Sequence, residues 1–482
     1  MGSGAPGRSE RCAGGVMLAR ASPQSDAAVR ATNDDACAVR FAPRGSAPLR
    51  RPASATSGSA AAGGRLARHE GVHRCAVARV ALRVPFGAPG CLPLTAKRGA
   101  YASSALARSL ARSLACLLQA RAAAGAMGYL CDPYAPRLLS GSSKAAARRA
   151  LARRRPPLIN RGTHARAMAV QRTLDAFLAA TASDMSRQIV SLGAGYSSSA
   201  LLLAQQRGGR PPRGLRFFEL DFHEVCAAKA ATVAADQEMM RLLGGAEGGE
   251  PDKIAEGVTD NRLAASGVEL DANACTLRTP AYCLFPCDLR DAVALREGLA
   301  AEGFDDAAPT LVLCECVLSY LDPVAGDALL EWAARLPQGA VAAYEAVGME
   351  DAFGQQMAQH LADRGCAMRG AAAGATLAAH EKRCEAAGFE HAQAVDMYTL
   401  YTCSPSLDRA EIARAARIEP LDEIEEWRML MQHYCFLVGS QQGLKEALWL
   451  TPGDEGAAAF PQGTPGMLLP GVPRPRGLPC AD

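Results

Sequence analysis

From about residue 156 to residue 440, short apolar runs alternate with longer stretches in which apolar residues recur every three or four positions. The runs have the length of buried strands, and the longer stretches have helical spacing, as at Val170, Leu174 and Phe177. We expect strands at 188–192, 215–220, 282–285, 310–314, 340–344, 392–397 and 434–438, and helices at 163–181, from 197 onward, and at 325–335, 353–364, 376–387 and 420–433. Apolar strands separated by helices predict an α/β fold, in which a mostly parallel sheet is covered by helices on both faces.

The first 125 residues lack this alternation and consist largely of Ala, Gly, Arg, Ser and Pro tracts. They hold 18 Lys and Arg against 5 Asp and Glu, although the whole chain has a net charge of only +3. A basic arm can bind nucleic acid, but almost no aromatic residues are available here to stack on bases. We therefore favour a leader without a fold of its own and expect no nucleic-acid partner. The segment 101–125 is Arg-rich, acid-poor and helix-compatible, which is also typical of a transit peptide.

The cysteines indicate a reducing compartment. All 17 are scattered through the chain, many of them in apolar stretches, and no two Cys-x-x-Cys units form a metal-type pair. Free, buried cysteines are expected in such a chain, together with a cytoplasmic location and no metal site. No apolar run approaches the roughly 18–20 residues that a membrane span requires, so we expect a soluble protein without a membrane partner.

Two glycines follow the first predicted strand, in Gly193-Ala194-Gly195, and a helical stretch begins just after them. Glycine at such a turn lets the backbone approach a ligand that a side chain would hold off. Many turns carry the same pair, so the motif gains meaning only from its neighbours. In parallel sheets ligands bind at the carboxyl ends of the strands, and the residues that follow the other strands decide the interpretation.

Acidic residues follow the next three strands. Asp221 stands where a carboxylate can accept hydrogen bonds from a ribose, and an ordinary surface or helix-capping aspartate is the alternative. Asp288 stands where it can accept a hydrogen bond from the amine of adenine, beside Leu289 with its backbone amide and apolar side chain. Glu315 directly follows a buried strand, so it either pairs locally or faces the ligand site. With Gly193, these residues predict a cofactor pocket.

A basic segment at 159–166 precedes the first predicted helix. Arg161 or Arg166 can hold a carboxylate through two parallel hydrogen bonds. A solvated charge on a helix is the more common situation, and the residues alone leave the choice open.

Nine motifs occur in one order along roughly 128–440. They include Val-Ser-Leu-Gly-Ala-Gly at 190–195, Phe-Glu-Leu-Asp-Phe at 218–222 and Glu-Cys-Val-Leu-Ser-Tyr at 315–320. The others lie at 159–166, 287–291, 344–347, 353–357, 394–397 and 433–435. As a set they resemble the leucine carboxyl methyltransferase family.

The resemblance implies a Rossmann-like fold with helical lid insertions and S-adenosylmethionine as the cofactor. It implies methylation of the α-carboxylate of the C-terminal leucine of the protein phosphatase 2A catalytic subunit by a monomeric enzyme. It also implies roles for individual residues. Arg166 matches the contact to the methionine carboxylate, Gly193 the cofactor loop, Asp221 the ribose ligand, Asp288 and Leu289 the adenine contacts, Glu315 the acid near the methionine amino group, and Tyr320 an aromatic position that lines the active site.

The chain departs from the family pattern near its N-terminus. Family members have an Asp-Asp-Ala segment that leads within about ten residues to Gly-Tyr-x-x-Asp-Pro-Tyr. Here residues 32–36 resemble the first part and 128–134 the second, and about 85 Ala/Arg/Gly-rich residues separate them. The family's cofactor-contacting lysine then corresponds to either Arg40 or Arg121, and Ala346 stands where the family usually has Gln.

This comparison predicts four regions. Residues 1–42 are a variable tail that ends in a lid-like segment, 43–126 are an insertion or a gene-model artefact, 127–440 are the methyltransferase domain, and 441–482 are a Pro/Gly-rich tail. On this interpretation a transit peptide is not expected.

Two other functions stay open. A related methyltransferase of tRNA wybutosine synthesis carries a C-terminal kelch propeller, and no 50-residue repeats follow the last predicted strand here. The second alternative is a catalytically inert module that binds the phosphatase, because the insertion interrupts the N-terminal lid.

Overall fold

The computed structural model describes residues 117–140, 154–182, 185–244 and 268–450. These residues form a nine-stranded sheet in the order β3-β4-β5-β2-β1-β6-β7-β9-β8. Five neighbouring strands, β5, β2, β1, β6 and β7, run parallel, and β9 is antiparallel to both β7 and β8. The strand bounds are β1 Arg187–Leu192, β2 Leu215–Asp221, β3 Glu269–Asp271, β4 Thr276–Arg278, β5 Tyr282–Pro286, β6 Thr310–Glu315, β7 Gly339–Ala346, β8 His391–Asp396 and β9 Tyr434–Ser440.

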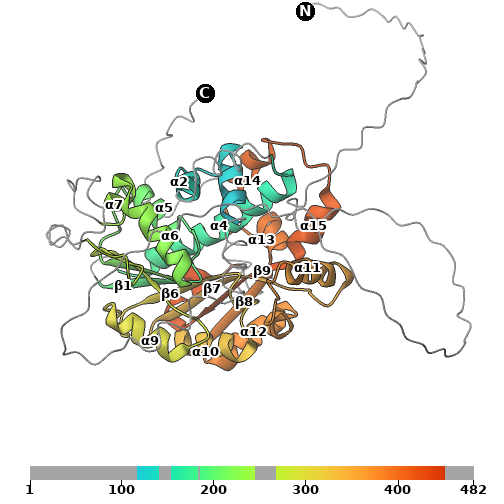
Figure 1. Cartoon of the computed structure of the whole chain (residues 1–482). Helices are drawn as coiled ribbons and strands as arrows, with labels where there is room; N and C mark the ends of the chain where they lie inside the picture. Colours follow the sequence, from blue (N-terminus) through green and yellow to red (C-terminus); the bar gives the residue numbers. More distant parts are fainter. Residues whose placement is uncertain (1–116, 141–153, 183–184, 245–267, 451–482) are drawn as a thin grey trace, which may run out of the picture. The chain divides into compact units, whose positions relative to one another are not determined.

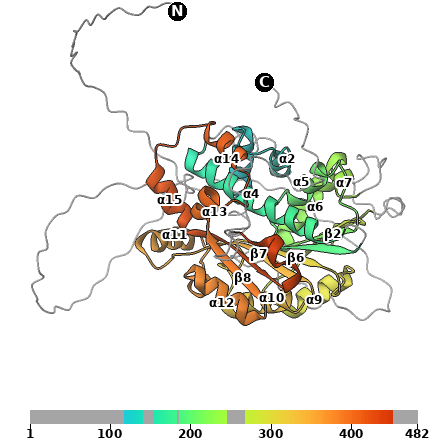
Figure 2. The same ribbon diagram turned by 180° about the vertical axis from the view of Figure 1, so that it is seen from behind.

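The helices lie in two layers, one on each face of the sheet (Figures 1 and 2). One face carries α9 Ala292–Ala301, α10 Pro323–Ala334 and α12 Leu377–Ala387. The other carries α4 Pro157–Ala180, α5 Ser199–Gln206, α6 His223–Ala234 and α7 Gln237–Leu242. On the same side, α2 Tyr134–Ser140 packs against α6, and α13 Met397–Cys403 packs against β8 and β9. The remaining helical elements are α11 Ala352–Asp363, η3 Ala371–Gly374, α14 Arg409–Ala416, α15 Ile424–Gln432, η4 Gln442–Leu444 and α16 Lys445–Leu448.

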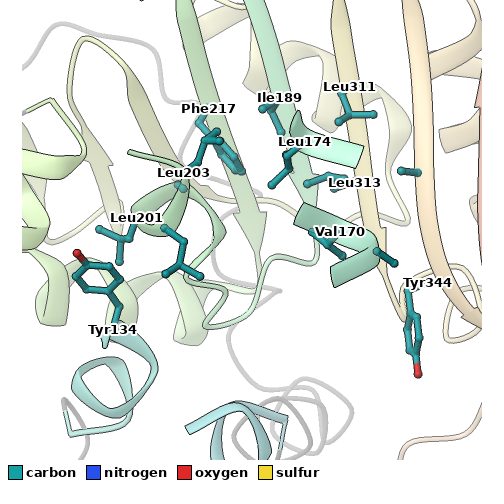
Figure 3. Packing of buried hydrophobic residues seen from close by; sticks show 14 of the residues in the cluster. Tyr134, Val170, Leu174, Ile189, Leu201, Leu203, Phe217, Leu311, Leu313 and Tyr344 are labelled. Carbon is teal, nitrogen blue, oxygen red and sulfur yellow. The ribbon is translucent and has the colours of Figure 1, made fainter. Parts of the chain in front are cut away.

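Two hydrophobic cores fill the space between the sheet and its helix layers. On the α4 side, Val170 and Leu174 of α4 belong to one core with Ile189 of β1 and Leu311 of β6 (Figure 3). On the other face, Val190 and Phe218 join residues of α9, α10 and α12. The central strand β1 is buried along its entire length because both faces are covered. The buried apolar area is the main source of stability in such a sandwich of layers.

Several helices begin where the sequence offers a cap. Asp291 accepts hydrogen bonds from the Val293 and Ala294 amides at the start of α9, and Thr376 caps α12 through the Ala379 amide. Gly388 ends α12 in the left-handed region, with φ of 106°. These short polar side chains satisfy amides that have no partner inside the helix.

All seven predicted strands are present, which confirms the α/β fold with its mostly parallel sheet and helices on both faces. The sequence did not indicate the β3–β4 hairpin, because each of its strands has only three residues. It also did not indicate the antiparallel direction of β9, since a buried strand has the same apolar pattern in either direction.

Three predicted boundaries differ from the structure. The segment 159–166 lies inside α4, which begins at Pro157, and does not precede it. The predicted insertion at 43–126 and the predicted tail at 441–482 both overlap folded residues. Residues 117–126 are helical and bury Leu118 and Ala122 in the core, while Leu444 and Leu448 of η4 and α16 are buried near the other end. The rest of both segments, and residues 1–42 with Arg40, lie outside the described residues.

The cysteines between 117 and 450 that the structure describes are all free, and most are buried, as expected. Within the same residues no group of His, Cys, Asp and Glu side chains is arranged to hold a metal ion. None of the described helices combines the length and apolar character needed to cross a bilayer.

Candidate functional site

The segments that follow β5, β2, β1 and β6 meet at one edge of the sheet, because these four strands are neighbours and parallel. The chain runs outward from β1 in both directions, to β2 on one side and to β6 on the other. Such a point, where the strand order reverses, leaves a crevice at the carboxyl ends of the strands.

A cavity of about 870 Å³, partly open to solvent, occupies this crevice. Six of the seven residues predicted for the site line it, and Arg166 is the exception. The lining comprises Leu117, Gly193, Asp221, Phe222, Cys287, Asp288, Leu289, Arg290, Glu315, Cys316, Val317, Tyr320, Leu321, Asp322 and Arg369.

Gly193 ends β1 in the left-handed region, with φ of +61°. A Cβ atom at this position would lie 2.8 Å from Cγ2 of Val317, in the segment that follows β6. Both the backbone conformation and the close contact therefore require glycine. The loop after β1 and the segment after β6 are consequently packed directly against each other on one side of the cavity.

Asp221 ties the end of β2 to the glycine loop. It is only 4% exposed, and its carboxylate accepts a hydrogen bond of 2.7 Å from the Gly195 amide. A second hydrogen bond of 2.7 Å comes from the Phe222 amide. Burial raises the pKa of Asp221 to about 6, against the opposing effect of these two amides. Ionisation of this buried carboxyl group is therefore unfavourable unless a further hydrogen-bond donor binds to it.

Asp288 and Leu289 lie beyond β5, on the side of the cavity away from β6. Arg290 folds back onto Asp288, with hydrogen bonds of 2.9 Å and 2.5 Å from its guanidinium to the two carboxylate oxygens. Burial alone would raise the pKa of Asp288, but the hydrogen bonds from Arg290 outweigh it and the pKa is lowered. Asp288 is therefore ionised. Its partner Arg290 is partly exposed and also lines the cavity.

Glu315 lines the cavity, and Arg166 of α4 stands behind it. The Nε atom of Arg166 donates a hydrogen bond of 2.7 Å to the Glu315 carboxylate. The guanidinium lies over the ring of Tyr344, 4.6 Å from its centroid, and Tyr344 in turn stacks on Tyr434. Burial alone would lower the pKa of Arg166, but the neighbouring Glu315 outweighs it and the pKa is raised, so the guanidinium stays charged. The other predicted arginine, Arg161, lies over the ring of Trp427 and does not line the cavity.

Tyr320 and Arg369 form the other end of the cavity lining. Burial, followed by the nearby Cys316, raises the pKa of Tyr320 well above its usual range. Its hydroxyl is therefore a neutral hydrogen-bond donor at physiological pH. Arg369 pairs with Asp322 at 3.4 Å, and both side chains are more than half exposed, so this pair is weak.

Sequence reasoning missed Arg369, because residues 365–370 show no periodic pattern that points to a site. It also missed Lys229. The Lys229 ammonium is buried with Glu219, at 2.5 Å, and donates a hydrogen bond of 2.7 Å to the Ser197 carbonyl in the loop between β1 and α5. Tyr282 donates to the same Glu219 oxygen. The position of Glu219, two residues before Asp221 on a strand, was the available signal for this buried network.

Asp132 joins the N-terminal part of the described fold to the glycine loop. One carboxylate oxygen accepts hydrogen bonds of 2.5 Å from both Ser198 and Arg121. The other oxygen caps the start of α2 through the Tyr134 and Ala135 amides. Arg121 thus lies one side chain away from the cofactor loop, on the same helical segment as Leu117 of the cavity lining.

The chain is similar in sequence to known proteins. The family model for leucine carboxyl methyltransferases matches residues 113–334. The Arabidopsis thaliana leucine carboxyl methyltransferase 1 homolog is 34% identical over 283 residues, which are 58% of this chain and 77% of that protein. Leucine carboxyl methyltransferase 1 of Bos taurus is 33% identical over 325 residues, or 66% of this chain and 87% of that protein.

A further relative has a different name. Human tRNA wybutosine-synthesizing protein 4 is 35% identical over 344 residues, which cover 70% of this chain but only 45% of that longer protein. Among solved structures, a Haemonchus contortus phosphoethanolamine N-methyltransferase 2 in complex with S-adenosyl-L-methionine is 12% identical. That match covers 56% of this chain and 52% of the other, with a TM-score of 0.28, which is too distant to support a functional conclusion.

The family model and two relatives at 34% and 33% identity, of which the chain covers 77% and 87%, agree with the motif order in the sequence. The methyl donor of this family of methyltransferases is S-adenosylmethionine. On this evidence, the chain belongs to the leucine carboxyl methyltransferase family.

Proposed function

We propose that this chain uses S-adenosylmethionine to methylate the α-carboxylate of the C-terminal leucine of the protein phosphatase 2A catalytic subunit. One observation carries the proposal: in a member of this family, a single cavity collects six of the residues that the family resemblance assigns to the reaction. The α-carboxylate as acceptor and the phosphatase as partner both rest on that resemblance.

The cavity fits an adenosine-containing cofactor. Gly193 lets the loop after β1 pack directly against Val317 at the cavity, and the buried Asp221 carboxylate is part of the cavity lining. Asp288 and Glu315 place two more carboxylates beside it, on either side in the order of the strands. When bound, S-adenosylmethionine supplies an activated methyl group on a positively charged sulfur.

Different residues of the chain are assigned to different parts of the cofactor. Asp221 accepts hydrogen bonds from the ribose hydroxyls, and because it also holds the Gly195 amide, it fixes the ribose relative to the glycine loop. Asp288 and Leu289 contact the adenine. Glu315 would face the cationic amino group of the methionine part. Arg166 holds the Glu315 carboxylate and does not line the cavity, so its assignment to the methionine carboxylate rests on the family resemblance.

We assign the family's N-terminal lysine position to Arg121. Its helix is part of the described fold, and it bonds to Asp132, which also holds Ser198 of the cofactor loop. Arg40, the alternative, lies outside the described residues. The guanidinium of Arg121 then supplies positive charge on the lid side of the cofactor.

The acceptor needs alignment more than activation. A peptide α-carboxylate has a pKa of about 3.3–3.7 and is ionised at neutral pH, so no strong base is required. Tyr320, held neutral by burial, donates a hydrogen bond to the acceptor carboxylate, and Arg369 provides a positive charge at the same end of the cavity. Orientation of the reacting atoms and exclusion of water then account for most of the rate.

A second candidate acceptor follows from the 35% identity to human tRNA wybutosine-synthesizing protein 4. Tritiated S-adenosylmethionine, offered with either the phosphatase catalytic subunit or tRNA, separates the two. We expect label in the phosphatase and none in the tRNA. Label confined to tRNA would establish the second candidate, whereas no label and no binding heat with S-adenosylmethionine would identify an inert module.

A further inference from the structure

The segment after β6 makes a tight turn on which two site residues depend. Glu315 precedes the turn, Tyr320 follows it, and both line the cavity. Cys316 begins the turn with φ of 60°, a left-handed conformation that non-glycine residues rarely adopt. Its amide donates a hydrogen bond of 2.7 Å to the Tyr344 carbonyl on β7. Such strain persists only where the surroundings hold the backbone in place.

The next three amides of the turn point at a single carboxylate. Glu345 on β7 is completely buried, and it accepts hydrogen bonds of 2.8 Å from both the Val317 and the Leu318 amide. It also accepts a hydrogen bond of 2.9 Å from the Ser319 amide and one of 2.6 Å from the Ser319 hydroxyl. The carboxylate therefore satisfies buried backbone groups that would otherwise lack partners.

The groups that act on this carboxylate among the described residues are hydrogen-bond donors of Val317, Leu318 and Ser319, and none of them is a cation. Burial raises the pKa of Glu345, and the donated hydrogen bonds oppose that rise. If the Glu345 carboxyl were protonated, its O–H group would be a hydrogen-bond donor placed among backbone amides that are donors too. The anionic form is thus the one that the turn requires, although burying it without a counter-ion is costly.

The turn held in this way reaches the cofactor loop directly. Cγ2 of Val317 lies where a Cβ atom on Gly193 would collide with it, so the two segments have no spare room. A shift of the turn would displace Glu315 and Tyr320 at its ends and would open the packing against Gly193.

We propose that Glu345 is a positioning residue, whose buried carboxylate holds the Cys316–Ser319 turn in the shape that sets Glu315 and Tyr320 at the cavity. This inference rests on the proposed function, because it takes that cavity to be the cofactor site. Glu345 acts through the turn and does not itself line the cavity.

The test is calorimetric titration of the full chain with S-adenosylhomocysteine, the product form of the cofactor. In Glu345→Gln the NH2 group of the new side chain is a donor that faces the donating backbone amides. We therefore expect the dissociation constant for S-adenosylhomocysteine to rise about ten-fold or more. The stoichiometry should stay at its wild-type value. A purely structural role would instead lower the stoichiometry or the melting temperature and leave the dissociation constant of the folded fraction unchanged.

Two further variants complete the design. Ser319→Ala removes one hydrogen bond to Glu345 and keeps the three amides, so we expect a smaller rise, about three-fold. Glu302→Gln is the matched control, because Glu302 is a largely buried carboxylate that binds Arg278 away from the cavity. In this variant the dissociation constant for S-adenosylhomocysteine should not change.

Unchanged dissociation constants in both Glu345→Gln and Ser319→Ala would overturn the proposal. If Glu345→Gln does not fold, Ser319→Ala decides alone, by a raised or an unchanged constant. A wild-type chain that binds no S-adenosylhomocysteine would refute the proposed function instead, so the two failures are distinguishable.

Discussion

At the scale of single residues, the site depends on carboxylates in different environments. Asp221 is buried against two amides and has a pKa raised to about 6, whereas Asp288 has a pKa lowered by Arg290 in spite of its burial. Both were predicted from their positions after buried strands. Their different charge behaviour was not predictable, because it depends on which donors the fold brings to each oxygen.

The raised pKa of Asp221 predicts a pH dependence of cofactor binding. Ribose hydroxyls donate to the ionised carboxylate, so the pKa in the complex falls below the value of about 6 in the free protein. Binding then releases a proton at lower pH, and affinity for S-adenosylhomocysteine should rise as the pH increases toward 6 and level off above it. Titration calorimetry between about pH 5 and 8 measures this.

Asp221→Asn should abolish that dependence, and Asp288→Asn is the matched control. The pKa of Asp288 is already low, so its replacement should weaken binding and leave the pH dependence in place. Affinity that stays flat with pH in the wild type would contradict the ribose assignment of Asp221.

At the scale of elements, a buried polar network connects β2, β5, α6 and the loop between β1 and α5. Lys229 of α6 pairs with Glu219 of β2, and both are almost completely buried. Removal of one member leaves the other charged without its partner, which typically costs about 3–5 kcal/mol. Lys229→Met should therefore lower the free energy of unfolding by about that amount, as measured by urea denaturation.

The double variant Lys229→Met, Glu219→Leu should recover much of the loss, because no unpaired charge remains. The exposed pair Arg335–Glu331 is the control, and Arg335→Gln should cost less than about 1 kcal/mol. A Lys229→Met variant as stable as that control would show that the buried network is not holding α6 to the sheet.

The elements themselves were largely predictable. The seven long strands are mostly apolar runs, and the parallel direction of all of them except β9 follows from the helices between them. The β3–β4 hairpin escaped because three-residue strands such as Thr276–Arg278 carry too little pattern. Glu345 escaped for another reason: its partners are amides 26 to 28 positions earlier in the chain, and no local pattern encodes that contact.

At the scale of the whole molecule, the start of the folded domain lies earlier than the motif order implied. The family model matches from residue 113, and the helix at 117–126 buries Leu118 and Ala122 and bonds Arg121 to Asp132. We predict that deletion of 43–112 preserves cofactor binding and the melting temperature. Deletion of 117–126 should reduce both, because it removes core side chains and a buried ion pair. Thermal unfolding with and without S-adenosylhomocysteine distinguishes the two, and equal effects would contradict this boundary.

The central claim is methylation of a C-terminal leucine carboxylate, and the most direct measurement compares two forms of the phosphatase catalytic subunit. One has its intact C-terminus and the other lacks only the final leucine. With purified chain and tritiated S-adenosylmethionine, we predict label in the intact subunit, released by mild base as expected of a methyl ester, and none in the truncated form. Equal labelling of both forms, or none in either while a related leucine carboxyl methyltransferase labels the intact one, would contradict the account.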